Sequence, residues 1–129
     1  MPYQVITTVQ VPAERIANCF VGAFESGVCS WIHSARLEEG SPVDEIAYAC
    51  ETMLDQSGWS FLIQYDAPSE REGTFTGKAY VGWSQVQAGL EVMAKDYPQH
   101  FADLIQENDD AITHDVFMQC VILGEVVYG

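Results

Sequence analysis

The densest group of residues that could bind a metal or move a proton lies between positions 107 and 115. The segment Glu107-Asn108-Asp109-Asp110-Ala111-Ile112-Thr113-His114-Asp115 combines carboxylates, an amide and an imidazole. Asp110 and His114 stand four residues apart, a spacing that can place two ligands on one helix face. The segment has neither the pattern of a calcium loop nor an HExxH motif. We therefore expect Asp109 or Asp110 to cap a helix, and we expect no metal and no cofactor.

Nucleophilic catalysis would require Ser or Cys beside His, with a carboxylate to orient the imidazole. The sequence contains three histidines but no nucleophile elbow and no phosphate-binding loop. We expect packing or capping roles for His33 and His100, and no enzymatic activity. The enzymatic alternative is a metal-assisted hydrolase built on Asp109, Asp110, His114 and Asp115.

The four cysteines show no spacing typical of a metal site. They are Cys19, Cys29, Cys50 and Cys120. We expect free buried thiols, because a chain of 129 residues can bury a sizeable core without disulfides. The start of the sequence lacks a signal peptide, and no apolar run is long enough to cross a bilayer, so we expect a cytoplasmic protein.

The net charge of −14 comes from two acidic regions rather than from the whole chain. Residues 37–70 hold eight acidic residues and residues 96–125 hold seven, and neither region contains Lys or Arg. Direct nucleic-acid binding is disfavoured, because few cations are available to neutralise phosphates and they are scattered. The cations are Arg15, Arg36, Arg71, Lys78 and Lys95.

These acidic regions are the expected binding surface for a basic partner. Concentrated carboxylates repel one another, and they can match the charge density of a nucleic-acid duplex. A second copy of the chain is a further candidate partner. The expected partner-binding residues are Glu38, Glu39, Asp44, Glu45, Glu51, Asp55, Asp103, Glu107, Asp109, Asp110 and Asp115.

The hydrophobic pattern predicts a single α+β domain over residues 1–129. Strict alternation predicts a strand over residues 3–11, and Pro12 then opens a helix that ends near Gly27. Further strands are expected over residues 29–37, 59–65 and 75–81, which gives a small, mostly antiparallel sheet of about four strands. Residues 43–56 are compatible with a short helix or a loop.

The remainder predicts a C-terminal cluster of about three helices. Helical periodicity follows Gly82, and Pro98 separates the first of these helices from a short second one. Residues 116–123 are apolar on nearly every side, which fits a buried helix or a central strand, and we favour the helix. Trp31 and Trp59 are expected in the core, although Trp31, Trp59 and Trp83 also offer stacking surface for a ring-shaped ligand.

Two stretches of the sequence carry a family resemblance: VPAERIANCFVGAFESGVCSWI, residues 11–32, and GLEVMAKDYPQHFADLIQENDDAITHDVFMQCVILGEVVYG, residues 89–129. They resemble a family of small uncharacterised proteins encoded by bacteriophages, prophages and plasmids. The resemblance implies a protein that disables host machinery, and it carries no catalytic residues. We therefore expect an anti-CRISPR-like inhibitor that occupies a basic surface of a nucleic-acid-handling defence complex. A sponge or sensor for a small nucleotide is the alternative binding function.

Overall fold

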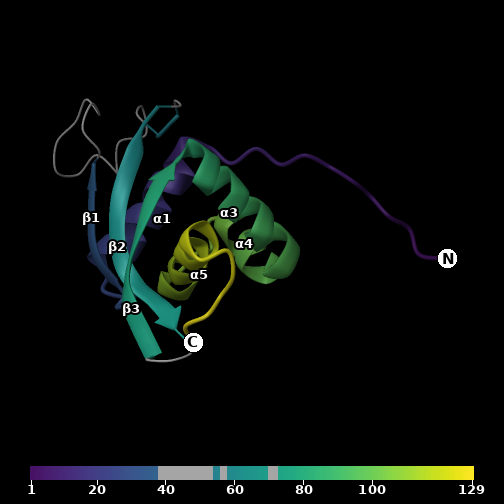
Figure 1. The fold of residues 1–129 in the computed structure, drawn as a ribbon. Coiled ribbons are helices and arrows are strands. Elements are labelled where there is room, and N and C mark those ends of the chain that lie inside the picture. The colour runs from purple at the N-terminus through teal and green to yellow at the C-terminus, as the bar shows by residue number, and fades with distance from the viewer. Residues whose placement is uncertain (38–53, 56–57, 70–72) are drawn as a thin grey trace.

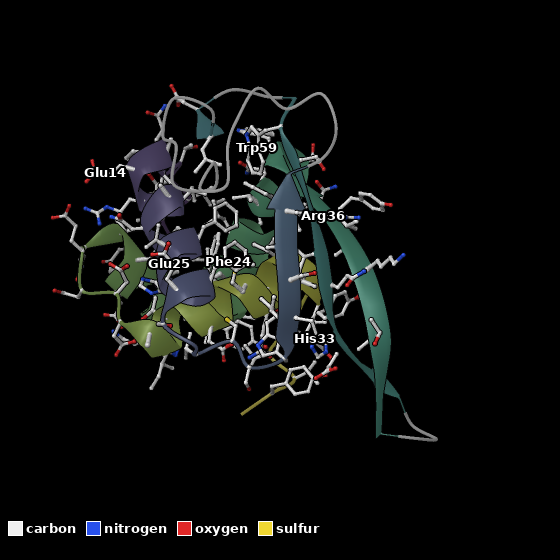
Figure 2. The ribbon with its side chains drawn as sticks, turned by 90° about the vertical axis from the view of Figure 1, so that its left-hand side faces the viewer. Glu14, Phe24, Glu25, His33, Arg36 and Trp59 are labelled. Atoms are coloured by element: carbon white, nitrogen blue, oxygen red, sulfur yellow. The ribbon has the colours of Figure 1, made fainter. Side chains whose placement is uncertain are left out.

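The computed structural model describes residues 1–37, 54–55, 58–69 and 73–129. This part of the chain contains four helices and three strands, so the α+β class is confirmed. The strands form one antiparallel sheet in the order β1-β2-β3, and the helices cover one of its faces (Figures 1 and 2). No described helix is long and apolar enough to span a membrane.

The N-terminal helix α1 (Ala13–Glu25) begins and ends where the sequence predicts. Pro12 is its N-cap, and its fixed φ of −65° suits the entry into a helix. Gly27 follows the C-cap with a φ of 80°, a left-handed conformation that glycine adopts without strain. The buried face of α1 includes Ile16, Cys19 and Phe20, which matches the predicted stripe.

The sheet consists of β1 (Ile32–Leu37), β2 (Ser60–Ser69) and β3 (Gly73–Gly82). The last two form a long hairpin in continuous antiparallel register from Ser60 opposite Gly82 to Ser69 opposite Gly73. Both strands extend further than their hydrophobic residues alone predict, because a two-stranded ladder can continue beyond the core with polar side chains.

The predicted strand over residues 3–11 is wrong. Residues 1–11 have no secondary structure, and residues 1–10 are exposed, with the chain running away from the body (Figure 1). Three strands are therefore described instead of about four. Alternation defines which face of a strand is apolar, but a strand also needs a neighbouring backbone to complete its hydrogen bonds. Most of the predicted helix or loop over residues 43–56 lies outside the described residues.

The C-terminal half contains α3 (Trp83–Asp96), α4 (Pro98–Ile105) and α5 (Ala111–Ile122). The preference for a helix over residues 116–123 is confirmed, with Leu123 as the C-cap of α5. Residues 116–121 of α5 are buried without interruption. This explains why its sequence is apolar on every side: α5 contacts α1, α3, α4 and β3.

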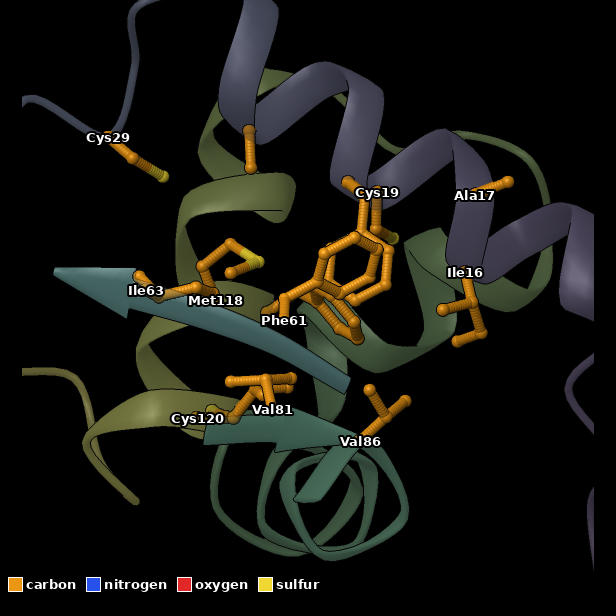
Figure 3. Packing of buried hydrophobic residues seen from close by; sticks show 14 of the residues in the cluster. Ile16, Ala17, Cys19, Cys29, Phe61, Ile63, Val81, Val86, Met118 and Cys120 are labelled. Atoms are coloured by element: carbon orange, nitrogen blue, oxygen red, sulfur yellow. The ribbon is translucent and has the colours of Figure 1, made fainter. Parts of the chain in front are cut away.

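The core lies between the helices and the sheet (Figure 3). Phe20 is at its centre, with ring centroids 5.7 Å from those of both Phe61 and Phe117. Trp59 packs edge-on against Phe20 at 6.2 Å. Aromatic pairs in such tilted geometry contribute about 0.5–1.5 kcal/mol each beyond the area they bury. The core therefore joins α1, β2 and α5 through one aromatic group.

Candidate functional site

The expected partner-binding residues divide between the described and the undescribed parts of the chain. Six of them lie in the part that the structure describes. Asp55 is exposed, and the other five belong to α4, to α5 or to the connection between them. The remaining five, Glu38, Glu39, Asp44, Glu45 and Glu51, lie outside the described residues.

The connection between α4 and α5 gathers four carboxylates in eight residues. We call Asp103, Glu107, Asp109 and Asp110 the acidic turn. The backbone reverses sharply here: Glu107 has a φ of 62°, and the amide of Asn108 donates to the carbonyl of Asp103 at 2.8 Å. Glu107 is exposed and Asp103 is partly exposed, so both carboxylates can reach a partner.

Helix α1 adds its first turn to the same side of the molecule. Arg15 forms an ion pair with Glu107, and the Arg15 side chain is mostly buried while that of Glu107 is mostly exposed. Glu14, the neighbour of Arg15, is exposed at the start of α1 (Figure 2). Arg15 is thus shielded beneath Glu107, and the surface it supports remains acidic.

Asp109 is held by an imidazole rather than facing solvent. A hydrogen bond of 2.6 Å joins its Oδ2 to Nε2 of His114, and both side chains are mostly buried. Cys19 completes a group of three potential ligand atoms within 4.8 Å of one another. Burial, and the charge of Asp109, raise the pKa of the Cys19 thiol, which keeps it protonated near neutral pH. Asp109 and His114 therefore satisfy each other by hydrogen bonding, and together with the Cys19 sulfur they could hold a metal ion.

Asp110 caps α5, as the sequence predicts. Its Oδ1 accepts from the Thr113 amide at 3.0 Å, and the Thr113 hydroxyl lies 3.3 Å from the Asp110 amide in return. The hydrogen bonds that the carboxylate accepts, first from the Thr113 amide and then from the Thr113 hydroxyl at 3.1 Å, lower the pKa of Asp110. Asp110 remains exposed, so its charge is still presented at the surface.

Asp115 forms internal hydrogen bonds that the sequence did not predict. Its Oδ1 accepts from the indole of Trp31 at 2.8 Å and from the thiol of Cys29 at 3.3 Å. Its Oδ2 accepts from the amide of Gln119 at 2.9 Å. A carboxylate with this many internal donors joins α5 to the segment before β1, and it has little capacity left for a partner.

Gln119 is a structural residue that sequence reasoning missed. It is fully buried, and its Oε1 accepts from the amides of Val127 and Tyr128 at 2.7 and 2.9 Å. Tyr128 in turn donates its hydroxyl to the carbonyl of Asp66 and stacks on Trp31. The signal in the sequence was a single amide, that of Gln119, within an apolar run. Such an amide is expected to be buried and to need hydrogen-bond partners inside the protein.

Two of the four cations in the described part of the chain, Arg36 and Lys78, lie on the sheet, whereas Arg15 lies on α1 against Glu107 and Lys95 lies in the last turn of α3. Arg36 of β1 pairs with Leu62 of β2, which pairs with Tyr80 of β3. Two residues along the same strands, Gln64 of β2 pairs with Lys78 of β3. These positions alternate with core residues such as Ile63, so Arg36 and Lys78 point away from the helices. Figure 2 shows Glu14 and Arg36 on opposite sides of the molecule. Arg36 and Lys78 are therefore separated from the acidic turn, whereas Arg15 lies against it.

The hydrolase constellation is not assembled. Asp110 caps α5, Asp115 bonds Trp31, and only the pair Asp109–His114 remains. A second imidazole–carboxylate pair, His33 Nε2 with Asp66 Oδ1 at 2.6 Å, lies exposed at the sheet. Among the described residues, no Ser or Cys shares a hydrogen bond with either imidazole. Both pairs can act through charge and hydrogen bonding, and the Cys19 sulfur lies within 4.8 Å of the ligand atoms of Asp109 and His114.

The tryptophans divide as the packing interpretation expects. Trp31 and Trp59 are buried, whereas Trp83 is half exposed at the start of α3. Trp83 lines a groove with a volume of about 760 Å³ between α3 and residues 7–13, and the acidic residues Asp55 and Glu91 also line it. Acidic walls repel phosphate, so the groove does not favour the nucleotide alternative.

Comparisons of this chain with protein-family models, with curated proteins and with solved structures gave no match. The resemblance to phage and plasmid proteins therefore stays a prediction, and the geometry of the acidic turn has to carry any functional conclusion.

Proposed function

We propose that this protein is a non-catalytic binding protein whose acidic turn docks on a basic surface of another protein. The observation that carries the proposal is the gathering of exposed and partly exposed carboxylates at the acidic turn. Asp103, Glu107 and Asp110 gather at the α4–α5 connection, while Arg36 and Lys78 lie on the outer face of the sheet. Such a charge distribution orients the molecule toward a cationic partner and accelerates encounter.

The internal hydrogen bonds narrow which carboxylates are available for this role. Asp109 and Asp115 are engaged by His114 and by Trp31, so neither is free to pair with a cation of the partner. Asp103 is partly exposed and Asp110 is exposed, Glu107 is exposed although it pairs with Arg15, and Glu14 lies on the neighbouring first turn of α1. The proposed contact surface is therefore smaller than the full set of acidic residues in this region.

Nucleic-acid-handling complexes are the partner class that fits best. Their channels expose Lys and Arg at a spacing that matches phosphates, and clustered carboxylates can occupy the same positions. The narrower form of the proposal, an anti-CRISPR-like inhibitor from a phage or mobile element, rests on the sequence resemblance. In that form the protein competes with the nucleic acid for the basic channel of the defence complex.

The test is competition between this protein and target DNA for a purified RNA-guided effector complex. The protein is titrated against the complex and labelled DNA at low and high salt, and DNA binding is read by gel shift. The test variant is Asp103→Asn, Glu107→Gln and Asp110→Asn combined, in which Asn still caps α5. The control variant, Glu91→Gln, Asp96→Asn and Glu125→Gln combined, changes the net charge by the same amount elsewhere on the protein.

The proposal predicts that the wild type displaces DNA and that higher salt weakens this displacement. The protein concentration needed for half-displacement should rise at least about tenfold more in the test variant than in the control variant. Equal loss in both variants would show that net charge alone acts and would remove the acidic turn from the proposal. Absence of displacement at either salt concentration would exclude this partner class.

A further inference from the structure

Residues 1–11 form an extended segment that makes no backbone hydrogen bond to the rest of the described chain. Figure 1 shows it leaving the body near the starts of α1 and α3. Tyr3 and Ile6 are fully exposed, and Val5 is 87% exposed. Large apolar side chains and unpaired backbone groups are together typical of a strand that has no neighbour among the described residues.

The segment has one apolar face and one largely polar face. In an extended conformation Tyr3, Val5, Val9 and Val11 share one side with Thr7. The opposite side carries Gln4, Ile6, Thr8 and Gln10. An amphipathic strand of this kind covers an apolar surface with one face and meets water with the other.

A matching apolar surface lies directly beside this segment. The groove of about 760 Å³ has residues 7–13 as one wall and α3 as the other. Trp83, Val86 and Leu90 supply its apolar lining on α3. The groove therefore lies between the second half of the segment and the apolar lining of α3.

Charge decides which partner fits the segment. Residues 1–13 contain no Asp, Glu, Lys or Arg, although the whole chain carries −14. A basic partner would have no carboxylate to pair with along this segment. A second copy of the segment carries no charged side chain either, so two copies can approach each other here without repulsion between side chains, and both have the same amphipathic pattern. Two identical strands can also pair antiparallel about a twofold axis, which makes the contact self-complementary.

We propose that residues 3–11 pair with the same residues of a second copy as an antiparallel ribbon, whose apolar face covers the groove along α3. The ribbon supplies the missing backbone partners and removes Tyr3 and Val5 from water. This inference is independent of the proposed function, because the acidic turn takes no part in it. The two contacts also respond oppositely to salt: screening weakens binding of a basic partner, but it strengthens association of two acidic bodies.

The experiment measures the mass of the full-length protein by sedimentation over a range of concentrations, together with amide hydrogen exchange of residues 3–10. The variant Val5→Asp places a charge on the apolar face, and Gln4→Asp adds the same charge on the polar face. Both side chains are exposed, so the body should fold normally in each variant. Circular dichroism checks this.

The proposal predicts a dimer whose amides at residues 3–10 exchange slowly, with a dissociation constant that falls as salt rises. Val5→Asp should weaken the dimer at least about tenfold more than Gln4→Asp, because it forces a carboxylate into an apolar contact. The proposal would be overturned by a monomer at all concentrations or by a dimer whose amides at residues 3–10 exchange fast. Equal increases of the dissociation constant in the two variants would also overturn it. Slow exchange in a monomer would place the segment on its own body and would overturn it as well.

Discussion

Gly22 of α1 lies directly against the imidazole of His114 on α5. A Cβ added at Gly22 would collide with Nδ1 of His114, far inside contact distance. The absence of a side chain at Gly22 thus allows the His114–Asp109 hydrogen bond to form beneath α1.

This contact makes even a small side chain at position 22 costly. Gly22→Ala should destabilise the protein by about 1–3 kcal/mol through overpacking, although Ala is normally the better helix former. In a His114→Ala background, Gly22→Ala should cost much less of the free energy of unfolding, because the imidazole that it collides with is gone. A double-mutant cycle measured by urea unfolding should therefore show that the two substitutions together cost less than the sum of their separate costs. Additive effects would mean that the imidazole is free to move aside.

Gly89 and Val121 make an equally close approach between α3 and α5. A Cβ at Gly89 would lie 2.7 Å from the Cα of Val121, which cannot rotate away as a side chain can. Gly89→Ala should therefore cost about 1–3 kcal/mol in the free energy of unfolding. Ser84→Ala, at an exposed position on the same helix, serves as the control and should be nearly neutral.

Gln119→Met should separate hydrogen bonding from packing, since the two side chains are similar in size. The substitution leaves the amides of Val127 and Tyr128 and one oxygen of Asp115 without their partner. We expect a loss of about 2–4 kcal/mol, together with faster amide exchange over residues 126–128. Gln106→Met, at an exposed position, is the control. An unchanged exchange rate over residues 126–128 would contradict the assigned role.

The pH dependence of stability should reveal the cap of α5. Because the pKa of Asp110 is lowered in the folded protein, its contribution is fully present above the ordinary value of 3.8 and is lost as the pH falls through the folded value. Asp110→Asn keeps an acceptor at the N-cap but cannot titrate. The stability advantage of the wild type over this variant should therefore shrink on acidification, as followed by thermal unfolding. A difference that is constant with pH would argue against the cap as the cause.

The buried cysteines should resist alkylation in the native state. Burial raises the pKa of Cys120 to about 12 and that of Cys29 higher, so little reactive thiolate exists at pH 8. Iodoacetamide should modify Cys19, Cys29 and Cys120 only after denaturation, with peptide mass spectrometry as the measurement. Fast labelling of Cys29 in the native protein would show that its contact with Asp115 opens readily.

The sequence predicts the helices of this protein better than its site. Pro12, Gly27 and Asp110 mark helix ends through backbone constraints and caps, which are local effects, and all three predictions are confirmed. The strand over residues 3–11 failed because pairing is not local: alternation cannot indicate whether a second backbone is present.

The candidate site was predicted only in outline. The acidity of the site is visible in the sequence. Which carboxylates are exposed and which are hydrogen-bonded internally depends on contacts between distant elements. Asp115 meets Trp31 across 84 positions, and Arg15 meets Glu107 between α1 and the acidic turn. No local pattern encodes these partners, so surface carboxylates and internal ones look alike in the sequence.

The central place of α5 has a consequence for how the chain folds during synthesis. Its buried residues, such as Phe117, complete the core formed with Phe20 of α1 and Phe61 of β2. Until residues 111–122 have left the ribosome, α1 and the sheet can pack only against each other and against α3 and α4, and the apolar surface that α5 covers stays open. Contacts so distant in sequence form slowly, so part of this apolar surface stays exposed until α5 has been synthesised, and exposed apolar surface of this kind is what chaperones bind.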